Sequence, residues 1–197
     1  MSGYTRPFFI ASRMNFCSHC GSDQLTYQVL PLDTRPRLVC GACQKVHYQN
    51  PRMVVGCLPI KDDKILLCRR AISPQKGYWN LPAGFMEVGE TVEEAARRET
   101  WEESQAEVSL LHLHVVYSIL HVQQVIIFFQ AQVNNDHFQP DHESLEVTLF
   151  AESEIPWDEL AFSSNQFALE KYFTFKDHPE QKVHFGHFDK AQMGKNF

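Results

Sequence analysis

The sequence predicts a mixed α/β fold preceded by a small cysteine-rich β module. Two observations predict the α/β fold: apolar segments with strand-like patterning recur along residues 50–176, and that region has only two sizeable helical patterns. The module is predicted by two pairs of cysteines near the start of the chain. The 197 residues, 44% of them hydrophobic, suffice for one medium domain with a packed core and a small appendage.

Four of the six cysteines form the pattern C-x₂-C…C-x₂-C, a spacing typical of a zinc ribbon. The expected structural zinc ligands are Cys17, Cys20, Cys40 and Cys43. A segment of about 40 residues builds too small a core to fold alone, so a metal would supply the missing stability. We assign residues 14–48 to this ribbon, with two short strands around a proline-rich turn. The alternatives are two structural disulfides, which a reducing compartment disfavours, and a redox dithiol.

The α/β domain is expected to alternate strands with two helices. The expected strands are residues 53–60, 64–70, 78–85, 112–121, 123–133 and 144–150. The first two would form a hairpin, because they flank a short polar turn. A capping box of Thr91 and Glu94 predicts a helix from there to about Ser104, and residues 165–175 predict the last helix. The tail, residues 177–197, is expected either to be loose or to add an edge strand.

Three carboxylates share one face of the first predicted helix, since Glu99, Glu102 and Glu103 are spaced i, i+3, i+4. Like charges this close repel each other and weaken an ordinary helix, whereas a bound cation would remove that penalty. Clustered oxygen ligands suit Mg²⁺ or Mn²⁺, which complete their coordination shell with water and substrate phosphate. The alternative interpretation is a solvated acidic helix face.

Residues 84–106, GFMEVGETVEEAARRETWEESQA, resemble the signature of the Nudix hydrolases. The matching positions are Gly84, Glu90, Arg98, Glu99, Glu102 and Glu103. Two residues depart from the signature: Thr100 stands in an aliphatic slot and Gln105 in its glycine slot. The resemblance implies the Nudix α/β/α sandwich with a mixed sheet over residues 50–176. Some Nudix enzymes also carry a zinc ribbon N-terminal to this domain.

The resemblance also implies a metal-dependent pyrophosphohydrolase that cleaves a diphosphate joining a nucleoside to another group. Its metal ligands would be the three helix glutamates, the carbonyl of Gly84 and an acidic residue from a later loop. Glu143 and Glu146 are the candidates for that residue, and we prefer Glu146 because it sits just before an apolar strand segment. Arg98 is expected to fix the rotamer of a carboxylate, and Glu90 to tie the glycine turn to the helix. A glutamate of the helix or of the later loop would be the general base.

Longer segments resemble the plant organellar FAD pyrophosphatases over nearly the whole chain from Cys17, which implies cleavage of FAD to FMN and AMP. The proline-rich segment of NADH-type members is missing, and Val122 stands where ADP-ribose-type members have proline. NADH, ADP-ribose and ADP-sugars stay as alternatives, as does a binding adaptor with an inert Nudix domain. Phosphate-binding arginines and ring-stacking aromatic residues are the expected substrate contacts, with surface and core roles as the alternatives. The candidates are Arg52, Arg69, Arg70, Tyr78, Trp79 and Phe129.

The net charge of −6 argues against non-specific nucleic-acid binding, which needs a basic surface. The ribbon has few basic residues, so we expect a structural or dimerising role for it, with a homodimer as the assembly. No segment approaches the roughly 20 apolar residues that cross a membrane. The first residues are too polar for a secretory signal peptide, and we interpret residues 1–13 as a leader. We therefore expect a cytoplasmic protein that binds a dinucleotide, with neither a membrane nor a nucleic-acid partner.

Overall fold

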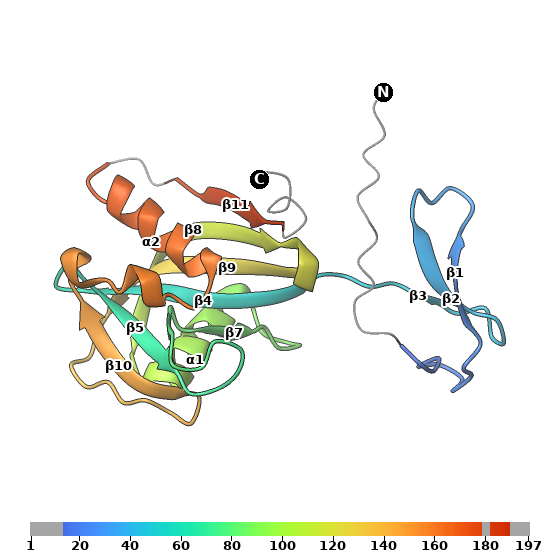
Figure 1. Cartoon of the computed structure of the whole chain (residues 1–197), viewed down its shortest axis with the longest axis horizontal. Coiled ribbons are helices and arrows are strands. Elements are labelled where there is room, and N and C mark those ends of the chain that lie inside the picture. The colour runs from blue at the N-terminus through green and yellow to red at the C-terminus, as the bar shows by residue number, and fades with distance from the viewer. Residues whose placement is uncertain (1–13, 179–181, 190–197) are drawn as a thin grey trace. The chain divides into compact units, whose positions relative to one another are not determined.

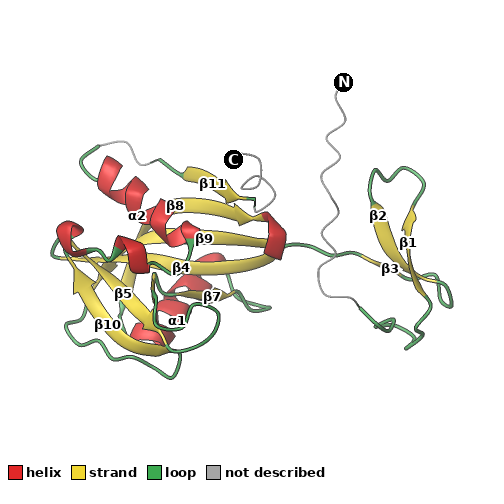
Figure 2. Cartoon of the chain, in the orientation of Figure 1, coloured by secondary structure: helices red, strands yellow, loops and turns green. Residues whose placement is uncertain are grey.

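The computed structural model describes residues 14–178 and 182–189, and the chain divides into two compact units, the first ending at Pro51 and the second beginning at Arg52. Each unit has a β-sheet of its own (Figures 1 and 2). The expected leader, residues 1–13, lies outside the described residues. Within the described ranges, no helix is long and apolar enough to cross a membrane.

The first unit is a three-stranded antiparallel sheet in the order β1-β2-β3. Strand β1 (Leu25–Val29) pairs with β2 (Pro36–Cys40), and β2 pairs with β3 (Val46–His47). The first two strands are the pair expected around the proline-rich turn, whereas β3 is too short to show a period in the sequence. Strand β1 is largely exposed, and the buried side chains of this sheet gather at the end of β2 around Cys40. Such a small core leaves the unit dependent on its cysteines.

The second unit is built on an eight-stranded mixed sheet with the order β10-β5-β4-β9-β8-β11, in which β6 pairs with β5 and β7 with β4. Its strands are β4 (Arg52–Lys61), β5 (Lys64–Arg70), β6 (Trp79–Asn80), β7 (Ala83–Phe85), β8 (Val108–Ile119), β9 (Gln124–Val133), β10 (Ser144–Phe150) and β11 (His184–Phe188). Strand β4 lies parallel to β9 along one edge, while β5 and β7 share its other edge. Strand β5 pairs with the Ile60–Lys61 end of β4, and β7 pairs with Val54–Gly56.

Helices cover both faces of this sheet, α1 (Val92–Ser104) on one and α2 (Ser163–Phe175) on the other (Figure 2). The alternation of β4 shows the two layers: Val55 belongs to the core beneath α1, whereas Leu58 belongs to the core beneath α2. Short 3₁₀ turns lie at Leu120–Val122, Glu152–Glu154 and Trp157–Glu159. The predicted α/β/α sandwich with a mixed sheet is confirmed.

The strand expected over residues 78–85 is divided into β6, which pairs with β5, and β7, which pairs with β4, whereas other differences lie at the ends of the expected elements. Strand β8 begins at Val108, earlier than expected, because two register shifts against β9 break the alternation of buried and exposed residues there. Helix α1 begins after Thr91 with the predicted capping box, while α2 begins at Ser163. Of the two expectations for the tail, the edge strand is found, since β11 pairs in parallel with β8.

Helix α1 ends in a left-handed residue that is not glycine. Gln105 has φ 55° and ψ 24°, and its N–H donates to the carbonyl of Trp101 at 2.7 Å. This is the position at which the Nudix signature has glycine. A side chain in this conformation brings Cβ close to the following backbone, a strain of roughly 1–2 kcal/mol that glycine avoids.

We expect Gln105→Gly to raise the free energy of unfolding of the second unit by about 1 kcal/mol, because the loss of Cβ strain outweighs the added freedom of the unfolded chain. Urea denaturation followed by tryptophan fluorescence would measure this. Gln105→Ala is the matched control, since it removes the same polar side chain but keeps Cβ. A glycine variant no more stable than the alanine variant would show that the turn is not strained.

Candidate functional site

The glycine turn and the glutamate helix meet at Gly84. Strand β7 holds Gly84 beside Val55 of β4. A Cβ built on Gly84 would overlap the carboxylate of Glu99, so only glycine lets that carboxylate lie against the strand backbone. The glycine therefore sets how closely helix α1 approaches the end of β7.

Arg98 connects the loop after β7 with the carboxylates of α1. Its Nε and Nη2 donate to Glu90 at 3.0 and 2.6 Å, and Nη2 also donates to the carbonyl of Phe85 at 3.1 Å. Its Nη1 donates to Glu99 at 2.7 Å and to Glu102 at 3.0 Å. One guanidinium thus fixes three carboxylates and one carbonyl from the loop and the helix.

Glu90 is the loop end of this network. Its carboxylate also accepts the backbone N–H of Glu87 at 2.6 Å, which closes the loop on itself. The hydrogen bonds from Arg98, followed by the one from Glu87, lower the pKa of Glu90 to about 2. Glu90 therefore stays charged and links the glycine turn to α1 through Arg98.

Glu103 is the buried member of the three helix glutamates, with 8% of its surface exposed. Its carboxylate accepts hydrogen bonds from Nδ2 of Asn80 and from the N–H of Ala83, both at 3.3 Å. Burial raises the pKa of Glu103 to about 8, the charge of Glu99 acts in the same direction, and the charge of Arg70 opposes it. Within the described chain, no Lys or Arg forms an ion pair with Glu103. A bound cation would supply the positive charge that this carboxylate lacks.

The other two glutamates lie at different depths. Glu99 is partly buried, and burial raises its pKa against the opposing effect of Arg98. Glu102 has 51% of its side chain exposed. Glu99 and Glu102 both accept a hydrogen bond from Nη1 of Arg98. The carboxylate oxygens of these three helix glutamates are hard ligands, and such a set of donors fits Mg²⁺ or Mn²⁺.

The loop before β10 faces the same helix. The charge of Glu143 raises the pKa of Glu99, and the charge of Glu102 contributes to the raised pKa of His142, after the larger effect of its hydrogen bond to Asp141. The loop therefore brings an acidic side chain toward the helix glutamates.

Glu146 lies within β10, in agreement with the strand expected over residues 144–150, and pairs with Arg69 of β5. Its carboxylate is 3.7 Å from Nη1 of Arg69 and accepts a hydrogen bond from Thr148 at 3.2 Å. Glu143 lies in the loop before the strand, and its charge is one of the causes that raise the pKa of Glu99. The ligand from this segment stays a prediction, with Glu143 and Glu146 as its candidates.

Trp79 and Phe129, two of the expected substrate contacts, lie in the hydrophobic core, which is the alternative role given for them. Trp79 is 6% exposed and packs edge-on against Phe150 with ring centroids 4.9 Å apart. Phe129 is buried in the core beneath α1. The pattern of a strand shows that successive side chains point to opposite faces of the sheet, but it does not show which face is covered by a helix. Tyr78, also a candidate, is half-exposed.

The candidate arginines occupy separate places. The guanidinium of Arg70 lies 5.1 Å from the ring of Phe162, and its charge reaches Glu103. The guanidinium of Arg52 lies 4.8 Å from the ring of Phe85, the half-exposed residue that follows the glycine turn. Arg70 is therefore the candidate arginine whose charge acts on a helix glutamate.

Asn80 is a site residue that the sequence analysis missed. It is buried on β6, donates to Glu103 and also donates to the carbonyl of Leu81 at 2.8 Å. Its only signal was a polar residue inside an apolar segment, YWNLPAGF. A buried amide needs partners, and here the partner is a catalytic candidate.

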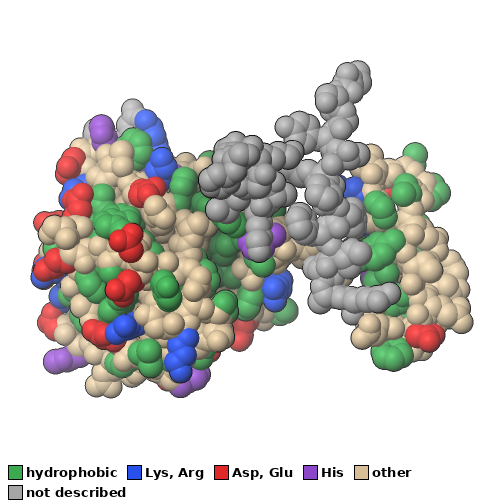
Figure 3. Space-filling model, in the orientation of Figure 1, with side chains coloured by type: hydrophobic (Ala, Val, Ile, Leu, Met, Phe, Trp, Pro, Cys, Tyr) green, Lys and Arg blue, Asp and Glu red, His purple; other side chains and the backbone are tan. Residues whose placement is uncertain are grey.

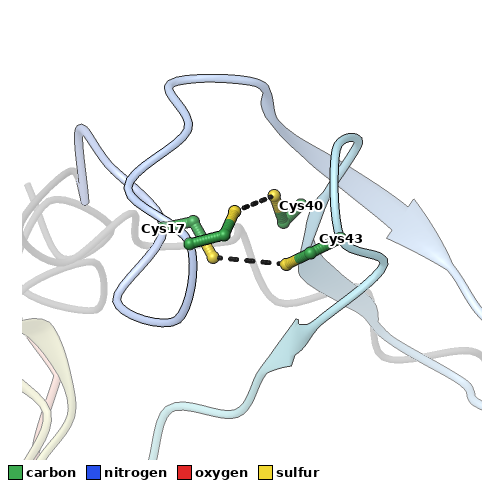
Figure 4. Close-up of side chains that lie close together, drawn as sticks. Cys17, Cys40 and Cys43 are labelled. Carbon is green, nitrogen blue, oxygen red and sulfur yellow. Dashed lines mark hydrogen bonds between the residues drawn. The ribbon is translucent and has the colours of Figure 1, made fainter.

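The four expected zinc ligands of the first unit converge. Figure 4 shows the sulfur atoms of Cys17, Cys40 and Cys43 turned toward one another. The Sγ atoms of Cys17 and Cys43 are 3.7 Å apart, those of Cys20 and Cys40 are 3.6 Å apart, and all four lie within 4.8 Å of one another. None forms a disulfide. The backbone N–H of Cys43 is the main cause that lowers the pKa of Cys40 to about 6. A closed set of four soft thiolates fits structural zinc.

Family comparisons agree with this arrangement of a cysteine module and a carboxylate site. The family model described as NUDIX domain matches residues 50–173, and the one described as Nudix N-terminal matches residues 15–49. The chain therefore belongs to the Nudix family and carries the family's N-terminal zinc ribbon.

Individual relatives cover different shares of the chain. A solved NUDIX hydrolase from Nitrosomonas europaea is 45% identical with a TM-score of 0.85, and the match covers 90% of this chain and 100% of that one. An ADP-ribose pyrophosphatase from Methanocaldococcus jannaschii is 46% identical over 71 residues, which are 36% of this chain and 42% of the relative. The NAD-capped RNA hydrolase NudC of Photobacterium profundum is 27% identical over 143 residues, which are 72% of this chain and 52% of the relative. The chain thus spans about half or less of the length of these two curated relatives.

Proposed function

We propose that this protein is a metal-dependent pyrophosphohydrolase that cleaves the diphosphate of a nucleoside diphosphate linked to a second group. The observation that carries the proposal is the environment of Glu103. Its carboxylate is buried, held by Asn80 and Ala83, and without a cationic ion-pair partner among the described residues. An inert adaptor domain would gain stability by replacing such a buried acid with an apolar side chain, whereas a metal-binding enzyme needs the carboxylate.

The proposed catalytic cofactor is Mg²⁺ or Mn²⁺. Its proposed ligands are the carboxylates of Glu99, Glu102, Glu103 and Glu143 and the carbonyl of Gly84. Glu143 replaces Glu146 in this set because its charge reaches Glu99. When bound, such an ion neutralises charge on phosphate oxygens and lowers the pKa of a bound water.

The chain's own groups position the reactants. Arg98 holds the rotamers of Glu99 and Glu102 through the hydrogen bonds of one nitrogen. Arg70 adds positive charge beside Glu103, and we assign it to a substrate phosphate, which its planar guanidinium can bind through two parallel hydrogen bonds. One carboxylate of the site takes the proton of the attacking water.

We propose FAD as the substrate, cleaved between its phosphates to FMN and AMP. Its support is the resemblance of long segments to the plant organellar FAD pyrophosphatases. ADP-ribose and NAD-type dinucleotides are the second candidates, favoured by the names of the relatives from M. jannaschii and P. profundum. Arg52 with Phe85 offers an exposed ring and a guanidinium that suit any of these substrates.

For the ribbon we propose a structural or dimerising role in a homodimer, without a nucleic-acid partner. The face seen in Figure 3 shows apolar side chains on the ribbon and little positive charge. Val29, Leu32 and Tyr48 are among its exposed apolar residues. Nucleic-acid binding needs clustered Lys and Arg instead. Free cysteines are typical of a reducing compartment, which supports our proposal of a cytoplasmic location.

Glu103→Gln should lower turnover by about 100-fold or more, as removal of a charged group that stabilises the transition state typically does. Steady-state rates at limiting Mn²⁺ would measure this, with circular dichroism to verify the fold. Glu93→Gln is the matched control, because Glu93 is an exposed glutamate of the first turn of the same helix. Near-normal turnover of the Glu103 variant would refute the assignment of this carboxylate.

Glu143→Gln and Glu146→Gln form a pair that tests the later-loop ligand. We expect the Glu143 variant to need at least about tenfold more metal for half-maximal activity. The Glu146 variant loses only an exposed ion pair with Arg69 and should behave as the unmodified protein. The reverse pattern in metal titrations of the two variants would restore Glu146 as the ligand.

Release of AMP and FMN from FAD should exceed release of products from NADH and ADP-ribose by tenfold or more in kcat/KM, a difference of about 1.4 kcal/mol. The assay uses the full chain with Mg²⁺ and with Mn²⁺, and solvent ¹⁸O should enter only one of the two monophosphates. A tenfold preference for NADH or ADP-ribose would reject FAD and leave the hydrolase proposal intact. No metal-dependent release from any of them would favour the adaptor.

A further inference from the structure

His47 touches a zinc ligand without belonging to the cysteine set. Its Nε2 lies 3.3 Å from Sγ of Cys17, and both residues are buried. Strand β3 positions the ring, because His47 pairs with Leu38 of β2 in the small sheet. The ring is therefore held against the sulfur by the strand pairing of the ribbon.

This contact differs from the others that the sulfurs make. Sγ of Cys17 also accepts a hydrogen bond from the backbone N–H of His19 at 3.4 Å. The thiol of Cys40 likewise accepts a hydrogen bond from the backbone of Cys43. Backbone donors of this kind come with the turns of each cysteine pair. Among the described ribbon residues, His47 is the one whose side-chain nitrogen reaches a ligand sulfur. It lies on β3, outside both C-x₂-C turns.

The charge of the site explains why a further donor is useful. Four thiolates around one Zn²⁺ leave a net charge of about −2 within a module whose core is small. A thiolate accepts hydrogen bonds but cannot donate them, so a neutral imidazole facing it carries its hydrogen on Nε2. Hydrogen bonds to charged groups are stronger than those between neutral groups.

We propose that His47 is a positioning residue of the zinc site, whose Nε2–H donates to Sγ of Cys17 and fixes that thiolate for metal binding. The four sulfurs already form a closed set, so His47 acts on a ligand and is not itself a ligand. Groups of this kind typically change metal affinity by about 10–100-fold when they are removed. The inference concerns the ribbon and does not depend on the proposed enzymatic activity.

The test compares His47→Gln with His47→Leu in the full-length protein. Gln places an amide N–H near the position of Nε2, whereas Leu has similar bulk and no donor. Competition with a chromophoric chelator should show zinc binding about tenfold or more weaker for His47→Leu, and close to normal for His47→Gln. His19→Leu is the matched control, because His19 is exposed and lies between two ligands. Cys40→Ser, which removes a ligand, gives the reference for a broken site.

Cobalt substitution adds a readout that a purely structural role would not move. Loss of the hydrogen bond raises the energy of the thiolate electrons, so the sulfur-to-Co²⁺ charge-transfer bands of His47→Leu should shift to lower energy. This measurement is made on the metal-bound state and holds even if the metal-free ribbon unfolds. The proposal is overturned if His47→Leu binds zinc as tightly as His19→Leu, or if His47→Gln is as weak as His47→Leu. Ligand-field bands of three sulfurs and one nitrogen would also overturn it, because His47 would then be a ligand.

Discussion

The guanidinium of Arg98 is the group on which the arrangement of the carboxylate site depends. It binds the loop through Glu90 and the carbonyl of Phe85, and it binds the helix through Glu99 and Glu102. Carboxylates one turn apart on a helix repel each other, and a shared cation turns that repulsion into a fixed geometry. The hydrogen bonds of Arg98 go to Glu90, Glu99 and Glu102 and not to Glu103. A bound cation would therefore interact most favourably at Glu103, which Arg98 does not neutralise.

The sheet brings the remaining parts to that helix. Strands β5 and β7 share one edge of β4, and this places β6 with Asn80 and β7 with Gly84 beside α1. Ala95 and Ala96 are fully buried in the core beneath α1, where small side chains let the helix lie close to the strands. Packing of the apolar face thus determines how near the carboxylates come to the glycine turn.

The two units would use metal ions for different physical reasons. In the ribbon, the exposed β1 and the small core leave the free energy of metal binding as a main source of stability. In the second unit, a large core already stabilises the fold, and a metal would offset the charge of buried carboxylates. The donors match this division, since thiolates suit zinc and carboxylate oxygens suit Mg²⁺ or Mn²⁺.

The sequence by itself determined the features that depend on spacing within one element. The capping box of Thr91 and Glu94, the shared face of the three helix glutamates and the paired C-x₂-C turns follow from local geometry. Only the tertiary structure decided that Glu146 lies beside Arg69 and that Trp79 is buried. Those outcomes depend on which strands pair and on which face of the sheet a helix covers. Contacts between distant segments set both, and no local period in the sequence records them.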